Sequence, residues 1–98
     1  LDVGDISWIQ GASQYSRVHA KNGEFLLSRS LASLEAELDP QRFFRIHRSA
    51  IVNAGHIREM RSGGGGGLLI LLHGGAAVPI GRARREVRKR LVEAIQRL

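Results

Sequence analysis

The chain is built from short segments with strand-like patterns, and turn-forming residues separate these segments. Residues 6–10 and 15–20 alternate apolar and polar side chains with a period of two, which is typical of a half-buried β-strand. Asn22 and Gly23 come directly before a further apolar segment over residues 24–28. Asn-Gly is the strongest short-range signal of a hairpin, because both central residues of a type I′ turn need a positive φ. The pattern therefore predicts that residues 24–28 pair back onto residues 15–20.

Alternation also indicates which side chains point inward. Within the second segment, Ser16 shares a face with Val18. The string "FRIHRSAIVN", residues 44–53, mixes core residues with cations, and an unbroken strand would place Arg48 on the same face as Ile46. We therefore predict a bulge or tight turn around Arg48, which would keep the apolar residues buried and turn the guanidinium outward.

The rest of the chain is predicted to add more strands and two helices. The predicted strands cover residues 43–47, 50–54, 56–60, 68–72 and 76–80. The segment "LLILL" is apolar throughout, so we expect it to be buried on both faces. Pro79 lacks a backbone donor and favours the edge of a sheet. Ser30 as N-cap, leucines at helical spacing and Pro40 as a stop predict a helix of about two turns. The sum is a mainly β fold.

The last segment, residues 81–98, is helical by period and amphipathic. Val87, Leu91 and Ala94 belong to one apolar stripe, and Arg85 and Lys89 project from the opposite face. The basic face has a plain alternative reading as a solvated surface. A role on a membrane surface or against another protein is a weaker alternative, because the apolar stripe is more simply used in the domain core.

The charge of the chain points to polyanions as partners. Fifteen Lys and Arg residues stand against nine Asp and Glu residues, which gives a formal charge of +6, and arginine dominates the positive set. A guanidinium can engage phosphate or guanine with two parallel hydrogen bonds. A basic surface can also serve solubility alone, so charge by itself does not decide between these roles.

Size and composition fit one intracellular domain. The chain has 98 residues, of which 43% are hydrophobic, and this suits a single compact core. It has no cysteine, which excludes disulfides and thiolate metal sites, and no apolar stretch approaches the roughly 20 residues that would span a bilayer. We expect a cytoplasmic location. The first residue is Leu1 rather than a methionine, which suggests a fragment of a longer protein.

Three possible catalytic or ligand sites can be weighed and set aside. The glycine run over residues 62–67 lacks the Lys and Ser or Thr of a phosphate-binding P-loop and is better explained as a hairpin turn. The four histidines lack the spacing of a metal site, so neither a metal nor a cofactor is expected. No serine lies in the setting of a catalytic nucleophile. We therefore do not expect an enzyme.

The order of these motifs resembles the LytTR family of bacterial DNA-binding domains found in response regulators. The resemblance covers nearly the whole chain, from "DISWIQGASQYSRVHAKNGEFLLSRSLASLEAEL" through "HIREM" to "VPIGRARREVRKRL". Its most specific part is "FFRIHRSAIVN", which is close to the family string F-x-R-x-H-R-S-x-I-V-N. The sequence departs from the family pattern at Gln10, Ala50 and Gly81.

The resemblance implies small antiparallel sheets packed side by side, with one short helix after the first hairpin and a basic C-terminal helix. It also implies that loops, rather than a recognition helix, enter successive major grooves of DNA. The positions carried over as base contacts are Ser16, Arg48 and Arg82. The residues expected to contact the DNA backbone are Arg17, Arg45, Ser49, Asn53, Arg85 and Lys89. His47 is expected to be structural and to fix the bend.

The function expected from these observations is sequence-specific binding of double-stranded DNA and control of transcription. Residues 1–98 would form one DNA-binding domain of a two-component response regulator, with a regulatory domain upstream in the longer protein. We expect repeated DNA sites bound by two protomers, and a homodimer in the full-length protein. An RNA-binding or other polyanion-binding module is the alternative, although exposed aromatic residues for base stacking are scarce and only Tyr15 is obviously placed.

Overall fold

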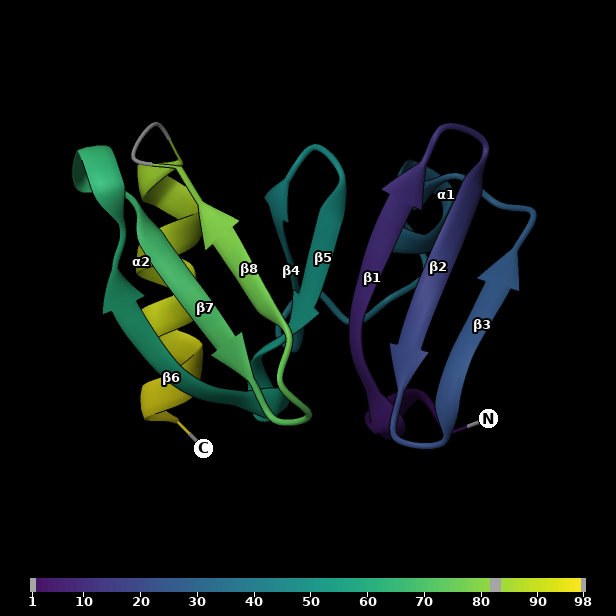
Figure 1. Cartoon of the computed structure of the whole chain (residues 1–98), viewed down its shortest axis with the longest axis horizontal. Coiled ribbons are helices and arrows are strands. Elements are labelled where there is room, and N and C mark those ends of the chain that lie inside the picture. Colours follow the sequence, from purple (N-terminus) through teal and green to yellow (C-terminus); the bar gives the residue numbers. More distant parts are fainter. Residues whose placement is uncertain (1, 82–83, 98) are drawn as a thin grey trace.

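The computed structural model describes residues 2–81 and 84–97 and shows two antiparallel sheets with two helices (Figure 1). The strands are β1 (Ile6–Ala12), β2 (Tyr15–Ala20), β3 (Gly23–Leu27), β4 (Phe43–His47), β5 (Ala50–Asn53), β6 (Ile57–Ser62), β7 (Leu68–Leu72) and β8 (Ala77–Ile80). The helices are α1 (Leu31–Glu35) and α2 (Arg85–Gln96), and the 3-10 turns are η1 (Val3–Asp5), η2 (Ala54–His56) and η3 (Gly64–Gly66).

The two sheets lie side by side, as the resemblance implied. The first sheet has five strands in the order β3-β2-β1-β5-β4, and the second has three in the order β6-β7-β8. Every strand pair is antiparallel. Figure 1 shows α2 behind the three-stranded sheet and α1 behind the five-stranded sheet. The prediction of a mainly β fold with one short helix and a C-terminal helix is therefore confirmed.

The hairpin predicted from Asn22-Gly23 is present, but its turn is centred one residue earlier. Ala20 pairs with Gly23, so Lys21 and Asn22 connect β2 to β3. Gly23 has a φ of 129°, whereas Asn22 is not among the residues with a positive φ. The type I′ prediction was therefore wrong. Glycine alone takes up the unusual backbone angle, because a residue without a Cβ adopts it at little cost.

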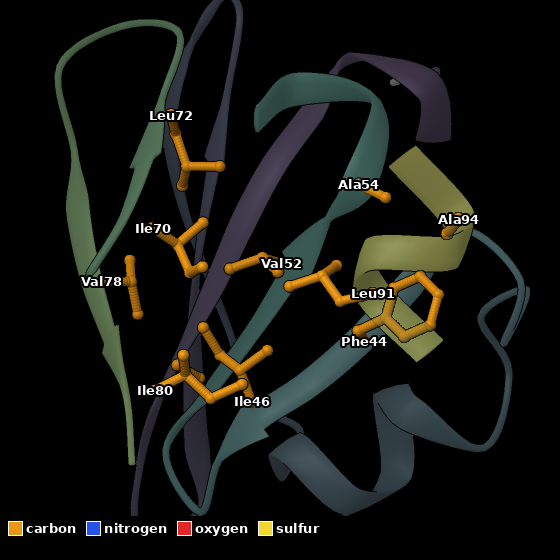
Figure 2. Packing of buried hydrophobic residues seen from close by; sticks show 11 residues of the cluster. Phe44, Ile46, Val52, Ala54, Ile70, Leu72, Val78, Ile80, Leu91 and Ala94 are labelled. Atoms are coloured by element: carbon orange, nitrogen blue, oxygen red, sulfur yellow. The ribbon is translucent and has the colours of Figure 1, made fainter. Parts of the chain in front are cut away.

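A single core joins both sheets to α2 (Figure 2). Its largest members come from β4, β5, β7, β8 and α2, namely Phe44, Ile46, Val52, Ile70, Leu72, Val78, Ile80 and Leu91. Strand β7, the segment "LLILL", was predicted to be buried on both faces. This is right for one face only, because Ile70 and Leu72 are buried whereas Leu69 and Leu71 are half-buried. Those two residues lie on the face of the sheet that points away from the core, where no described element covers them completely.

A second, smaller core lies between α1 and the five-stranded sheet. It contains Ile9, Val18 and Ile51 from the strands, with Leu31 and Leu34 from α1. The Ser30 hydroxyl oxygen accepts a hydrogen bond from the backbone N–H of the third residue of the helix at 3.1 Å, which confirms the predicted N-cap. Regular helix ends after five residues, earlier than the two turns predicted, and the chain continues in turns.

Two further predictions concern the edges of the elements, and Trp8 lies at the rim of a core. Pro79 lies in β8, an edge strand, as its missing donor required. The glycine run forms the turn between β6 and β7, closed by a 2.8 Å hydrogen bond from Gly63 N–H to the Gly67 carbonyl oxygen. Trp8 is half-buried at the rim of the larger core and stacks on His19 with 4.4 Å between ring centroids. Within the described residues, no helix is long and apolar enough to cross a membrane.

Candidate nucleic-acid interface

Several loops gather at one end of the molecule. Figure 1 shows the β1–β2 turn, the β4–β5 turn, the end of β8 and the start of α2 at the same end of the sheets. Arg82, a predicted base contact, follows β8 in the sequence and lies outside the described residues. Segments far apart in the sequence thus reach one surface, because strands β1, β4 and β8 all end there.

Arg48 lies exposed in the two-residue turn between β4 and β5. The predicted bend is present, since the pairing of β4 with β5 shifts register between Arg45 and His47. The shift leaves Phe44 and Ile46 buried while Arg48 points to solvent. The guanidinium of Arg48 is therefore presented by a turn that two buried strands anchor.

Arg45 holds the backbone of this turn. Its Nη2 donates to the carbonyl oxygen of Arg48 at 2.6 Å, and its Nη1 donates to Glu35 Oε1 of α1 at 3.1 Å. These bonds engage both ends of the guanidinium. The expectation that Arg45 contacts the DNA backbone stays a prediction, and these bonds also give Arg45 a positioning role beside Arg48.

His47 and Ser49 bond to each other across the same turn. His47 Nδ1 lies 2.9 Å from the Ser49 hydroxyl oxygen and accepts the Ser49 backbone N–H at 3.2 Å. His47 is exposed, so it does not act as a buried core residue. The bonds do fit the structural role that was expected of it.

Ser16 does not lie on the surface. Its side chain is completely buried, and the hydroxyl donates to the carbonyl oxygen of Arg29 at 2.7 Å. This bond ties the connection between β3 and α1 to β2. A hydroxyl with these contacts cannot reach the edge of a base, so the structure replaces the expected base contact with a structural role.

Asn53, expected to touch the DNA backbone, is also buried. Its Nδ2 donates to the carbonyl oxygen of Ile6 at 2.8 Å, and its Oδ1 accepts the Gly55 N–H at 3.0 Å. The amide thus links β5 to the start of β1 and caps the turn η2. Both polar ends are used within the fold, so this expectation is corrected as well.

The other expected backbone contacts are exposed cations. Arg85 and Lys89 lie on the solvent face of α2. Arg17, on β2, is exposed, and its Nη1 lies 3.5 Å from Oε2 of Glu24 on β3. Partial neutralisation by this carboxylate makes Arg17 a weaker attractor of phosphate than the cations of α2.

A cleft of about 420 Å³ lies between the β4–β5 hairpin and the start of α2. Its charged lining residues are Arg45, Arg48, Arg84, Arg90, Glu35 and Glu86. Arg84 and Arg90 were not predicted as site residues. The guanidinium of Arg90 lies 5.6 Å from the centroid of the Phe44 ring. The arginine-rich string before and within α2 was visible in the sequence, but nothing in it indicated which of its members would face Arg48.

The site can be described by what it can bind. Exposed guanidinium groups at one end of a rigid frame can hold anionic oxygens and can donate paired hydrogen bonds to the edge of guanine. Within the described residues, no group of three or more acidic or histidine side chains could hold a metal ion.

The family model for the LytTr DNA-binding domain, a class of domain found in transcription regulators, matches residues 1–93. The chain belongs to the LytTR family of DNA-binding domains.

Named relatives include regulators from several bacteria. The CO-responsive transcriptional regulator RcoM of Rhodospirillum rubrum is 42% identical over 84 residues, which cover 85% of this chain and 36% of the relative. The transcriptional regulatory protein LytR of Staphylococcus aureus is 32% identical over 66 residues, covering 67% of this chain and 27% of the relative. The chain thus spans roughly a third of the length of these relatives or less.

A solved structure has the same fold. It is the LytTr DNA-binding domain of a Bacillus cereus protein described as a methyl-accepting/DNA response regulator, with a TM-score of 0.85 and 23% identity. The match covers 94% of this chain and 84% of that one.

Proposed function

We propose that this domain binds specific sequences of double-stranded DNA and thereby controls transcription. The β4–β5 turn enters a major groove, and Arg48 donates to guanine there; the segment that carries Arg82 enters the next groove. The observation that carries this proposal is the exposed side chain of Arg48 on a fixed turn. Arg45 fixes the backbone of that turn, because its Nη2 donates to the Arg48 carbonyl oxygen at 2.6 Å. A turn whose backbone is already fixed loses less conformational entropy on binding.

Phosphates set the register of this complex. The exposed cations Arg85 and Lys89 of α2 are suited to contact the backbone of the duplex, because phosphate contacts position a protein without reading sequence. Arg84 and Arg90 add positive charge in the cleft beside Arg48. In this proposal, electrostatic capture by this surface precedes base reading. Because contacts to phosphates release counterions from the duplex, the affinity for DNA falls as the salt concentration rises.

Two protomers occupy repeated sites in this proposal, and the domain acts as the DNA-binding part of a larger regulator. The second point is supported by the relatives, in which the matched region is the smaller part of the protein. Selecting sites from a random duplex pool at physiological salt tests the first point. An enriched pair of equally spaced motifs is expected, and enrichment of single-stranded RNA in a parallel pool would contradict the choice of duplex DNA.

Replacing Arg48 tests the base contact directly. Arg48→Ala is expected to cost about 1 to 3 kcal/mol on the selected site and much less on random duplex, because a lost base contact affects only the specific complex. Titrations of both duplexes by fluorescence anisotropy at one salt concentration measure this difference.

Arg58→Ala is a matched control for this experiment. Arg58 is the exposed second residue of β6, and its removal costs the same unit charge. Strand β6 starts at the end of the sheets away from the β1–β2 and β4–β5 turns (Figure 1). Its loss should change both affinities little. Equal losses on both duplexes for Arg48→Ala would reduce Arg48 to a phosphate contact.

A further inference from the structure

Strand β3 forms the free outer edge of the five-stranded sheet. It pairs with β2 on one side, and no described strand pairs with its other side. In Figure 1 it lies at the opposite side of the molecule from α2. All five of its residues are exposed. A free edge of this kind presents unpaired backbone N–H and C=O groups that can accept another strand.

The side chains on this edge are apolar on both faces. Phe25, Leu26 and Leu27 follow one another and are 41%, 61% and 37% exposed. Leu26 shares a face with Arg17, and Phe25 shares the opposite face with Val18, because these residues pair across β2 and β3. Single exposed apolar residues are ordinary, but this open edge strand has three in a row, with no proline or bulge and with Glu24 as its one charge to protect the edge.

We propose that β3 pairs antiparallel with β3 of a second copy of this chain. A strand that covers this edge must bring apolar side chains to both faces of the sheet, and β3 itself has that pattern. Two-fold pairing with Leu26 on the axis sets Leu26 against the partner's Leu26 and Phe25 against the partner's Leu27. Cross-strand apolar pairs of this kind stabilise antiparallel sheets.

The distribution of charge favours this edge for self-association. Glu24 is the only charged residue of β3, and its carboxylate already has partners within the chain. Its Oε2 lies 3.5 Å from Arg17 Nη1, and its Oε1 lies 3.2 Å from His19 Nδ1. In the proposed register it faces the partner's Ser28, so no like charges are opposed. The basic helix α2 lies on the other side of the molecule (Figure 1), which keeps the two strongly positive surfaces apart.

One strand pair buries less area than a standard stable interface, so the dimer is expected to be weak and dependent on concentration. Sedimentation equilibrium of the 98-residue chain should show monomer at low concentration and dimer as the concentration approaches about 1 mM. Leu26→Lys, which adds a charge at the centre of the edge, should abolish the dimer. Val92→Lys, at an exposed position of α2, is the matched control and should dimerise like the original chain.

The absence of cysteine allows a direct test of the register. Leu26→Cys places two thiols opposite each other at the two-fold axis and should form a covalent dimer under mild oxidation. Glu24→Cys places its two thiols several residues apart and should not.

Three results would overturn the proposal. The first is an original chain that stays monomeric at about 1 mM, and the second is an undiminished dimer of Leu26→Lys. The third is equal cross-linking of the two cysteine variants.

Discussion

At the scale of single residues, the frame behind the loops depends on polar side chains that never reach solvent. Ser16 bonds to the connection before α1, and Asn53 bonds to the start of β1. The alternation of residues 15–20 already placed Ser16 on the face of Val18, whereas the resemblance carried it over as a base contact. Alternation was the better guide to this side chain, because it follows from the geometry of the strand itself.

Ser16→Ala separates these two roles. Removing the hydroxyl leaves the Arg29 carbonyl without its bond, so the free energy of unfolding should fall by about 0.5 to 1.5 kcal/mol. Chemical denaturation measures this loss. Affinity of the folded variant for specific duplex should stay within about twofold of the original. A large loss of affinity with unchanged stability would restore Ser16 to the interface.

His19 should make the stability of the domain sensitive to acid. Burial lowers the pKa of its imidazole, the carboxylate of Glu24 opposes that shift, and the guanidinium of Arg17 adds to it. The unfolded chain therefore takes up this proton at a higher pH than the folded chain. The contribution of His19 to stability is fully present above the usual histidine pKa of about 6.5 and is lost as the pH falls from there. The loss levels off below the lowered pKa of the folded chain.

His19→Phe keeps a ring stacked on Trp8 but removes the titrating group. The fall in melting temperature between about pH 7.5 and pH 5 should therefore be smaller in the variant than in the original chain. Melting curves followed by circular dichroism at several pH values measure it. An equal fall in both proteins would show that His19 makes no contribution.

At the scale of elements, the hairpins were the most predictable parts and the turn geometry the least. The strands of both predicted hairpins are present, since alternation and turn residues are local signals. The centre of the β2–β3 turn could not be predicted, because pairing along the whole strand decides it. Arg84 and Arg90 were missed for a related reason, since facing the β4–β5 turn depends on how α2 packs against β4.

The solvent face of α2 can be tested through one of its cations. Lys89→Ala should weaken binding to all duplex sequences alike and lower the salt slope by about one, because one fewer counterion is released. Titrations over a series of salt concentrations measure the slope. Lys21→Ala, in the turn between β2 and β3, is the matched control, and its slope should be unchanged. An unchanged slope for Lys89→Ala would remove this residue from the interface.

At the scale of the whole molecule, one core makes the two sheets dependent on each other. Ile70 and Leu72 of the second sheet pack in the same cluster as Ile46 and Val52 of the first. The sequence indicated which residues are apolar, and the family resemblance indicated two adjacent sheets. The apolar stripe of residues 81–98 predicted a place in the domain core, but it did not indicate which strands α2 would cover, because that contact joins segments far apart in the sequence.

Phe44 tests this dependence, since it is buried where β4 meets α2. Phe44→Ala should lower the free energy of unfolding by about 3 to 5 kcal/mol. Trp8 fluorescence and far-ultraviolet circular dichroism should report one coincident transition. Phe25→Ala, at an exposed position, is the matched control and should cost less than about 1 kcal/mol. Two separate transitions would mean that the sheets unfold independently.

The direction of β3 relative to the loops limits what a pair of these domains could do. β3 runs toward the end at which the β1–β2 and β4–β5 turns lie, so an antiparallel partner has its own turns at the far end (Figure 1). Two copies joined in this way could not sit on neighbouring repeats of one helix. They would instead tether two remote stretches of a chromosome, and the segment between them would close into a loop.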